Sequence, residues 1–185
     1  MNFLQSYTSL VVNFLSILTL AGQILAVILV VIIIFRPKAK IALWIEKNAL
    51  ILMFIVALTA TCGSLFLSEI AGWTPCKLCW FQRIMMYPQT LLLAVALWKR
   101  DRKIAPYILT LCLVGAAISA VHYAEQVSAA LNPVLVPAAC DLSGVSCASS
   151  QVSFAFGYIT IPMMALTAFV LIAINAVFII RRSKK

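Results

Sequence analysis

The sequence predicts an all-α integral membrane protein: a four-helix transmembrane bundle plus one extra transmembrane helix at its N-terminus. Three observations predict this class. The chain of 185 residues is 64% hydrophobic and 10% charged, and its mean hydropathy is +1.09, whereas soluble domains carry about 25% charged residues. The apolar residues form long runs. The basic residues fall mainly between those runs.

Five segments reach or nearly reach the about 20 apolar residues that a helix needs to cross a bilayer. No sequence period suggests a tandem repeat, and no stretch is left over for a soluble domain. We therefore divide the chain into residues 1–47, the extra helix with a basic loop, and residues 48–185, a four-helix domain with two cysteine-bearing loops. The five expected spans are residues 12–35, 48–68, 84–98, 104–125 and 156–180.

The first segment is expected to be a retained span rather than a cleaved signal peptide. Residues 1–10 contain no Lys or Arg, whereas a signal peptide begins with a basic region. The apolar run 24–35 is long and continuous, and Arg36, Lys38 and Lys40 follow it as a stop-transfer flank would.

The net charge of +9 indicates membrane orientation rather than a nucleic-acid partner. Twelve of the fourteen Lys and Arg residues lie between spans one and two, between spans three and four, or after span five. These regions share one side of a five-span topology, and the positive-inside rule makes that side cytoplasmic. We expect the N-terminus outside, the C-terminus inside, and the cysteine loops on the extracytoplasmic side of the cell membrane. Basic residues would contact anionic lipid.

Four of the six cysteines, Cys76, Cys79, Cys140 and Cys147, lie in the two expected outer loops, where disulfides form and persist. A zinc site is disfavoured because the second pair has six residues between its members and no supporting histidine. A c-type haem is excluded because Trp80 follows the first pair. Permanent structural disulfides are the main alternative to redox chemistry.

Cys62 and Cys112 fall inside apolar spans. A small buried hydrophobe is the expected role for both.

The residues before the first pair favour a helix start. Thr74 suits the N-cap and Pro75 the first helical position, which places Cys76 and Cys79 in the opening turns of the third helix. There the helix dipole and free N–H groups favour a thiolate over a thiol.

Two basic residues break the positive-inside pattern, and both lie at this pair. Lys77 stands between the cysteines, and Arg83 follows Cys79 by four residues, so the two share a helix face. A reactive thiolate needs such charges and a structural bridge does not. The pattern therefore favours redox function. 

Pro88, inside the third span, indicates either an ordinary kink or a pocket beside Arg83. Gln82, Tyr87 and Gln89 would line such a pocket, and their spacing leaves both interpretations open.

The second loop, residues 126–154, contains no Lys or Arg. Gly144 and the serines around it would make the loop flexible, which suits a disulfide attacked by another protein, but a permanent bridge fits equally well. His122, at the outer end of the fourth span near Glu125, is either a hydrogen-bonded anchor or a proton-transfer group.

The run Cys76-x-Leu-Cys79-Trp-x-Gln-Arg83 resembles the signature of the DsbB family of membrane disulfide-forming oxidases. The run from Cys140 through Gly144 to Cys147, followed by Phe-Gly-Tyr-Ile-Thr-Ile-Pro at residues 156–162, resembles the compact BdbC-type branch. The resemblance covers roughly residues 51–180. Related vitamin K epoxide reductases have the two cysteine pairs in the opposite order.

The resemblance implies an enzyme that reoxidises a DsbA-like thioredoxin-fold thiol oxidase and passes electrons to membrane quinone, either menaquinone or ubiquinone. By the same resemblance the partner would attack Cys140, and Cys147 would exchange with Cys76. Cys79 would face the quinone, with its charge stabilised by Arg83. The family core has four spans, so residues 12–35 have no assigned role. The expected quinone-side residues are Cys79, Arg83, Gln82, Tyr87 and His122.

Two other functions stay open at this point. One is a non-enzymatic membrane scaffold or assembly subunit whose outer loops are held by structural disulfides. The other is an enzyme that carries reducing power outward, for which cysteines facing the cytoplasm would be expected.

Overall fold

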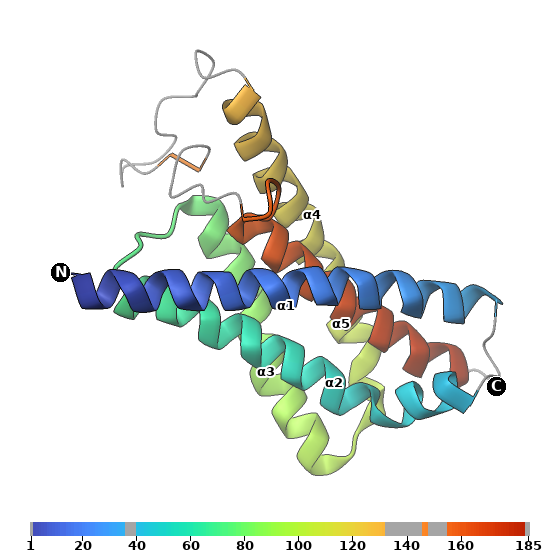
Figure 1. Ribbon diagram of the computed structural model, residues 1–185. Coiled ribbons are helices and arrows are strands. Elements are labelled where there is room, and N and C mark those ends of the chain that lie inside the picture. Colours follow the sequence, from blue (N-terminus) through green and yellow to red (C-terminus); the bar gives the residue numbers. More distant parts are fainter. Residues whose placement is uncertain (1, 36–39, 132–145, 148–154, 184–185) are drawn as a thin grey trace.

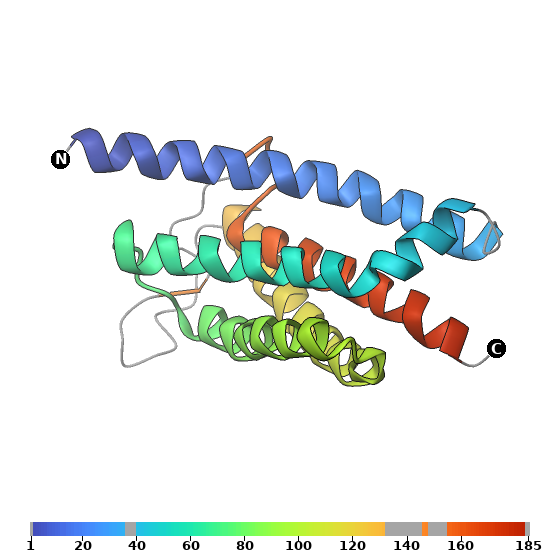
Figure 2. The ribbon, with the colours of Figure 1, turned by 90° about the horizontal axis from the view of Figure 1, so that it is seen from below.

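The computed structural model describes residues 2–35, 40–131, 146–147 and 155–183, and in this part of the chain the long elements are all helices. The expected all-α class is confirmed. Five long helices pack side by side (Figures 1 and 2). In chain order the elements are α1 (Asn2–Phe35), α2 (Lys40–Leu65), the π-helical turn η1 (Phe66–Ile70), α3 (Lys77–Lys99), the 3₁₀ turn η2 (Arg102–Ile104), α4 (Ala105–Leu131) and α5 (Ile161–Ser183).

Four helical segments are long and apolar enough to cross a membrane, as expected for a multi-pass protein. They are Tyr7–Phe35, Lys40–Ile70, Arg102–Leu131 and Ile161–Arg181.

α3, the third of the five expected spans, is not among these four. Its 23 residues would extend about 34 Å at 1.5 Å per residue, which is enough to cross the bilayer core of about 30 Å. α3 is not among the four because of its composition: Gln82, Gln89 and Thr90 lower its hydropathy. These polar side chains are buried inside the bundle, while Leu91 is 71% exposed on the outside. The five-span topology stays a prediction.

α5 lies at the centre of the bundle and contacts α4 and α2 most extensively. Phe169 of α5 is fully buried and fills the space over Gly115 of α4. A Cβ atom on Gly115 would lie 2.3 Å from Cζ of this ring, so only glycine fits there. The main core cluster extends from this contact to Met53 of α2 and Leu93 of α3.

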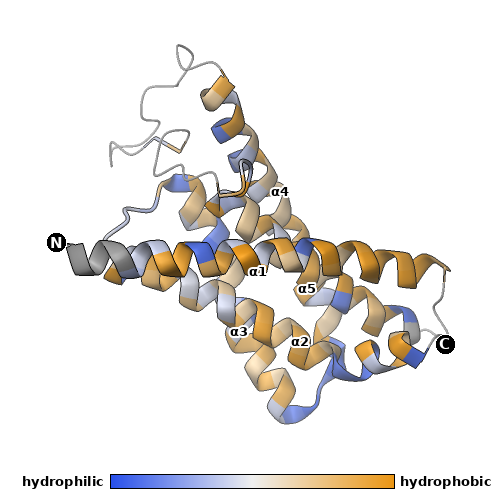
Figure 3. Cartoon of the chain, in the orientation of Figure 1, coloured by the Kyte–Doolittle hydropathy of each residue, from blue (hydrophilic) through white to orange (hydrophobic). Residues whose placement is uncertain are grey.

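The outer surface of the bundle is strongly apolar (Figure 3). Large exposed side chains such as Val27 and Leu113 would be unfavourable in water but are suited to lipid. Cys62 lies on this surface, so the expectation that it is buried is wrong. The reason is that α2 turns the neighbouring Thr61 inward, where its hydroxyl lies 2.9 Å from that of Thr90. Cys112 is fully buried, as expected.

The two ends of the bundle differ in chemistry. At one end, Arg102 forms a salt bridge of 2.9 Å with Glu46 and donates to the backbone carbonyls of Glu46 and Lys47. The C-terminal end of α1, the N-terminal end of α2, the α3–α4 turn and the C-terminal end of α5 all lie at this end, whereas the N-terminal ends of α1 and α3 lie at the other (Figure 1). Arg102 is thus separated from the first cysteine pair by the length of the bundle.

α5 begins at Ile161, five residues after the expected start of the fifth span. The intervening turn explains the difference, because Phe156 and Gly157 have left-handed backbones, with φ of 52° and 81°. The first helical hydrogen bond then runs from the N–H of Met164 to the carbonyl of Thr160 (2.9 Å).

Candidate active site

Cys76 occupies the N-cap position of α3. Its backbone is extended (ψ 174°), and its carbonyl accepts a hydrogen bond of 3.1 Å from the N–H of Trp80. The prediction that Thr74 caps this helix is wrong, since α3 begins at Lys77. Tertiary contacts explain the later start: Cys76 is fully buried with its sulfur beside His122, and this position requires an extended residue ahead of the helix.

Cys79 lies in the first turn of α3, and its sulfur receives two hydrogen bonds from Cys76. The Cys76 thiol donates to it over 3.4 Å, and the Cys76 backbone N–H also donates to it. The second bond joins the N-cap backbone to the side chain three residues later, as in a capping box. The capping role that the sequence suggested for Thr74 is therefore taken by the two cysteines themselves.

These bonds make the two thiols unequal. The hydrogen bond from the Cys76 thiol lowers the pKa of Cys79, although burial acts in the opposite direction; the Cys76 N–H and the charge of Arg83 lower it further. The same thiol bond, which needs the proton on Cys76, raises the pKa of Cys76 to about 11, and burial adds to this effect. Cys79 is thus the thiol of the pair that loses its proton first, and Cys76 the one that keeps it longer.

Cys147 lies against the same helix end. Its thiol hydrogen bonds with the Cys76 sulfur, and the backbone N–H of Leu78 also donates to the Cys147 sulfur. Burial, followed by the bond with Cys76, raises the pKa of Cys147 to about 12. The three sulfurs therefore form a row from Cys147 through Cys76 to Cys79. Cys140, expected to act with Cys147, lies outside the described residues.

His122 of α4 is buried directly beneath this row. Its Nε2 lies 3.6 Å from the Cys76 sulfur and 3.3 Å from the carbonyl oxygen of Cys147. Its Nδ1 lies 3.2 Å from Nε2 of Gln82. Because the Gln82 amide nitrogen can only donate, Nδ1 accepts and the ring proton is on Nε2, facing Cys76. The histidine is hydrogen-bonded as an anchor would be, and its Nε2–H faces the Cys76 sulfur.

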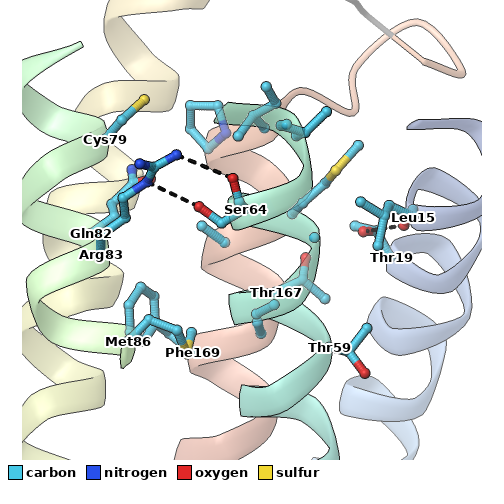
Figure 4. Close-up of a pocket in the computed structure, with 18 of the residues that line it drawn as sticks. Leu15, Thr19, Thr59, Ser64, Cys79, Gln82, Arg83, Met86, Thr167 and Phe169 are labelled. Atoms are coloured by element: carbon cyan, nitrogen blue, oxygen red, sulfur yellow. Dashed lines mark hydrogen bonds between the residues drawn. The ribbon is translucent and has the colours of Figure 1, made fainter. Parts of the chain in front are cut away.

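Arg83 is held by Ser64 of α2. Its Nε donates to Ser64 Oγ over 3.1 Å and its Nη2 donates to the Ser64 carbonyl over 3.2 Å (Figure 4). Tyr87 donates to the same hydroxyl over 3.1 Å, and the guanidinium carbon lies 5.2 Å from the Trp80 ring centroid. Arg83 is thus fixed one helical turn from Cys79, on the same face of α3.

A cavity of about 310 Å³ opens beside Cys79 and Arg83 (Figure 4). Its polar end also includes Gln82, Tyr87 and His122. Gln89 does not line it and instead accepts a hydrogen bond from the Cys112 thiol (3.2 Å). The rest of the lining is largely apolar. It includes Leu15, Leu18, Ile55, Val56, Met86 and Phe169.

Sequence reasoning missed two polar residues of this site. Ser64 carries no local signal, because its role depends on the packing of α2 against α3. Gln126 of α4 is 3% exposed and lines the cavity, and its Oε1 has no hydrogen-bond partner among the described residues. An unpaired buried amide oxygen is costly, so it indicates a place for a ligand group that donates.

The reduced pair could also hold a soft metal ion. The ligand atoms of Cys76, Cys79 and His122 lie within 4.8 Å of one another. The sequence argument against zinc concerned the second pair, and it did not consider that His122 reaches the first. Such an ion would occupy the sulfurs that disulfide exchange needs.

Comparisons with known proteins give a consistent result. The family model described as "Disulfide bond formation protein DsbB" matches residues 46–179. The chain is 42% identical over 131 residues to "Disulfide bond formation protein C" of Bacillus subtilis, which covers 69% of this chain and 91% of that protein. It is also 42% identical over 135 residues to "Probable disulfide formation protein C" of Halalkalibacterium halodurans, covering 73% of this chain and 95% of that protein. No solved structure matches the chain.

The matched part leaves α1 outside. The family model begins at residue 46, whereas α1 ends at Phe35.

Proposed function

The chain belongs to the DsbB family of disulfide bond formation proteins, and we propose that it reoxidises an extracytoplasmic DsbA-like thiol oxidase and passes the electrons to membrane quinone. The observation that carries the proposal is the row of sulfurs Cys147, Cys76 and Cys79, which ends at the cavity beside Arg83. Disulfide exchange needs such a row, because each thiolate must reach the next sulfur.

The exchange steps follow from the row. A thiolate of the reduced partner attacks Cys140 of a Cys140–Cys147 disulfide, and the partner's second thiol resolves the mixed disulfide. Cys147, now a free thiolate, attacks Cys76, forming a Cys76–Cys147 bond and breaking the Cys76–Cys79 bond. The electron pair leaves on Cys79. Its lowered pKa makes it the better leaving group of the pair.

The cycle closes when Cys140 attacks Cys147 and releases Cys76. Cys76 leaves poorly as a thiolate, because its thiol has a raised pKa of about 11. His122 lies 3.6 Å away with its Nε2 proton facing that sulfur, so it donates a hydrogen bond that stabilises the Cys76 thiolate as it leaves.

The cavity suits a quinone in size and chemistry. It is mostly apolar, it places a cation beside the thiol with the lowered pKa, and it contains Oε1 of Gln126, which has no partner in the described part of the chain. Arg83 would donate to one ring oxygen, and Gln126 would accept from a hydroxyl of the reduced ring. Bound quinone would supply an acceptor for two electrons and two protons, which converts the Cys76–Cys79 dithiol back to a disulfide.

The proposal also assigns an orientation in the membrane. The cysteine end of the bundle faces the outside of the cell membrane, and the basic end with Arg102 faces the cytoplasm.

The test is turnover by the purified protein. We expect it to oxidise a reduced thioredoxin-fold partner with stoichiometric loss of quinone absorbance, and Cys79→Ser and Cys140→Ser to abolish both signals. Cys112→Ser is the matched control and should keep them. Full turnover by either of the first two variants would overturn the proposal, and so would a wild-type protein that reduces neither a benzoquinone nor a naphthoquinone. In the latter case a structural role for the disulfides would be favoured.

A further inference from the structure

α1 forms one wall of the cavity, although it lies outside the family match. Leu15 and Thr19 of α1 line the cavity opposite Cys79 and Arg83 (Figure 4), and Leu18 lines it too. The family model matches residues 46–179, so this wall comes from a helix outside the matched domain.

α1 is held against the rest of the bundle by specific contacts. It packs chiefly on α5, where a Cβ atom on Gly22 would lie 3.0 Å from Cδ1 of Leu171. Gln23 donates to the Thr167 hydroxyl over 3.3 Å and accepts from the Tyr158 hydroxyl over 2.6 Å. Close approach at small residues and hydrogen bonds between helices are what hold helices together in lipid. The cavity wall that α1 contributes is thus a fixed one.

α1 also reaches the segment that holds Arg83. The Leu15 side chain packs on Gly63 of α2, where a Cβ atom would lie 3.0 Å from Leu15 Cδ1. The next residue, Ser64, accepts the two hydrogen bonds of the Arg83 guanidinium. The cavity therefore runs from Cys79 and Arg83 past Ser64 to the side chains of α1 without leaving the helix bundle.

The two ends of this cavity differ in polarity in the way that a prenylated quinone does. The end at Arg83 and Gln126 is polar and suits the ring oxygens. The end formed by Leu15 and Leu18 of α1 and Ile55 and Val56 of α2 is apolar and suits a hydrocarbon tail.

We propose that α1 is the tail-binding wall of the quinone site, with Leu15 and Leu18 contacting the part of the tail next to the ring. This inference rests on the proposed quinone reduction. Since the tail moves from lipid into the cavity and not from water, shape and close contact decide its binding, and the hydrophobic effect contributes little. Changes in this wall should therefore affect affinity for tailed quinones and leave the chemistry at Cys79 unaltered.

The experiment compares two neighbouring residues of α1 with two quinones. Leu18→Trp adds bulk at a side chain that lines the cavity. Ile17→Trp, the matched control, adds the same bulk at the neighbouring side chain, which does not line the cavity; both side chains are partly exposed, Leu18 by 42% and Ile17 by 57%. The probes are a methylated dimethoxybenzoquinone ring and the same ring with a decyl tail.

We expect Leu18→Trp to raise the KM for the decyl quinone roughly tenfold, equivalent to about 1.4 kcal/mol, with kcat unchanged. The KM for the bare ring should stay within twofold, and Ile17→Trp should change neither KM. Binding is measured without turnover as the rise in melting temperature of the oxidised protein on adding decyl quinone. Leu18→Trp should reduce this rise and Ile17→Trp should not.

Leu18→Ala provides a second variant that adds no bulk. It should weaken binding of the decyl quinone by about threefold, because only packing contacts are lost. The inference is overturned if the Leu18 variants have the same KM for the decyl quinone as Ile17→Trp, while the wild type reduces both probes. If the wild type reduces neither probe, the proposed function itself fails.

Discussion

The thiol of Cys76 donates a hydrogen bond of 3.4 Å to the sulfur of Cys79, and this single contact makes the two cysteines of the helical pair chemically different. It stabilises the proton on Cys76 and the negative charge on Cys79. The row of sulfurs therefore has a direction: in the proposed exchange Cys76 is attacked first, and charge accumulates at Cys79 next to Arg83 and the cavity.

The first prediction concerns the pH dependence of the reduction potential of the Cys76–Cys79 pair. Reduction takes up two protons below the pKa of Cys79 and one proton above it, since Cys79 then stays a thiolate. The potential should fall by about 59 mV per pH unit below that pKa and by about 30 mV per unit above it. The lowered pKa of Cys79 places the break below pH 9.0, and the raised pKa of Cys76 keeps the shallower slope up to about pH 11. 

This profile is measured by equilibrating the Cys140→Ser/Cys147→Ser protein with dithiothreitol buffers and counting the thiols by mass. The steeper slope continuing beyond pH 9 would contradict the assignment of Cys79 as the thiolate.

The second prediction concerns His122. His122→Phe keeps a planar ring but removes the Nε2–H that faces Cys76. A hydrogen bond to a charged group contributes about 1.5–3 kcal/mol, so release of the Cys76 thiolate should slow by roughly tenfold or more and the Cys76–Cys147 disulfide should accumulate during turnover. Non-reducing peptide mapping of quenched samples detects it. Tyr123→Phe, a change at the neighbouring half-buried residue, is the control. An unchanged disulfide distribution in His122→Phe would show that this hydrogen bond does not assist the release of Cys76.

The third prediction concerns the support of Arg83. Ser64→Ala removes the hydroxyl that accepts from Arg83 Nε and from Tyr87. Leaving partly buried donors unpaired costs about 1–3 kcal/mol, and we expect the KM for quinone to rise about tenfold while partner binding is unchanged. Ser68→Ala, one turn along the same helical segment, is the control: it removes a hydroxyl that bonds to the Ser64 carbonyl and to Glu69, but leaves the Ser64 hydroxyl in place. Equal KM values for the two variants would show that Ser64 does not position the guanidinium.

The fourth prediction concerns the contact between α4 and α5. Gly115→Ala places a methyl group 2.3 Å from the Phe169 ring, and overpacking of this kind typically costs about 1–3 kcal/mol. We expect a lower melting temperature, largely restored by adding Phe169→Leu, which shortens the opposing side chain. Leu113→Ala, at a 60% exposed position of the same helix, should have little effect. Failure of Phe169→Leu to compensate would mean that the loss arises elsewhere.

The sequence by itself determined the class of the protein, the helices and the chemistry of the helical cysteine pair. Hydropathy is a local property of the chain, so the long apolar runs predicted helical segments directly. Arg83 could be placed beside Cys79 because residues four apart share a helix face. The weakest helix prediction was α3, whose buried Gln82 and Gln89 make it look less like a span than its neighbours.

Only the tertiary structure decided how the site is completed. Ser64 of α2, His122 of α4 and Leu15 of α1 reach the cysteines or the cavity from helices that are distant in sequence, and no local pattern specifies which helix faces which. The helix start at Lys77 was misplaced for the same reason, because burial of Cys76 against His122 overrides the capping preference of Thr74. Packing of separate helices brings these groups together. A sequence pattern along one helix cannot contain that information.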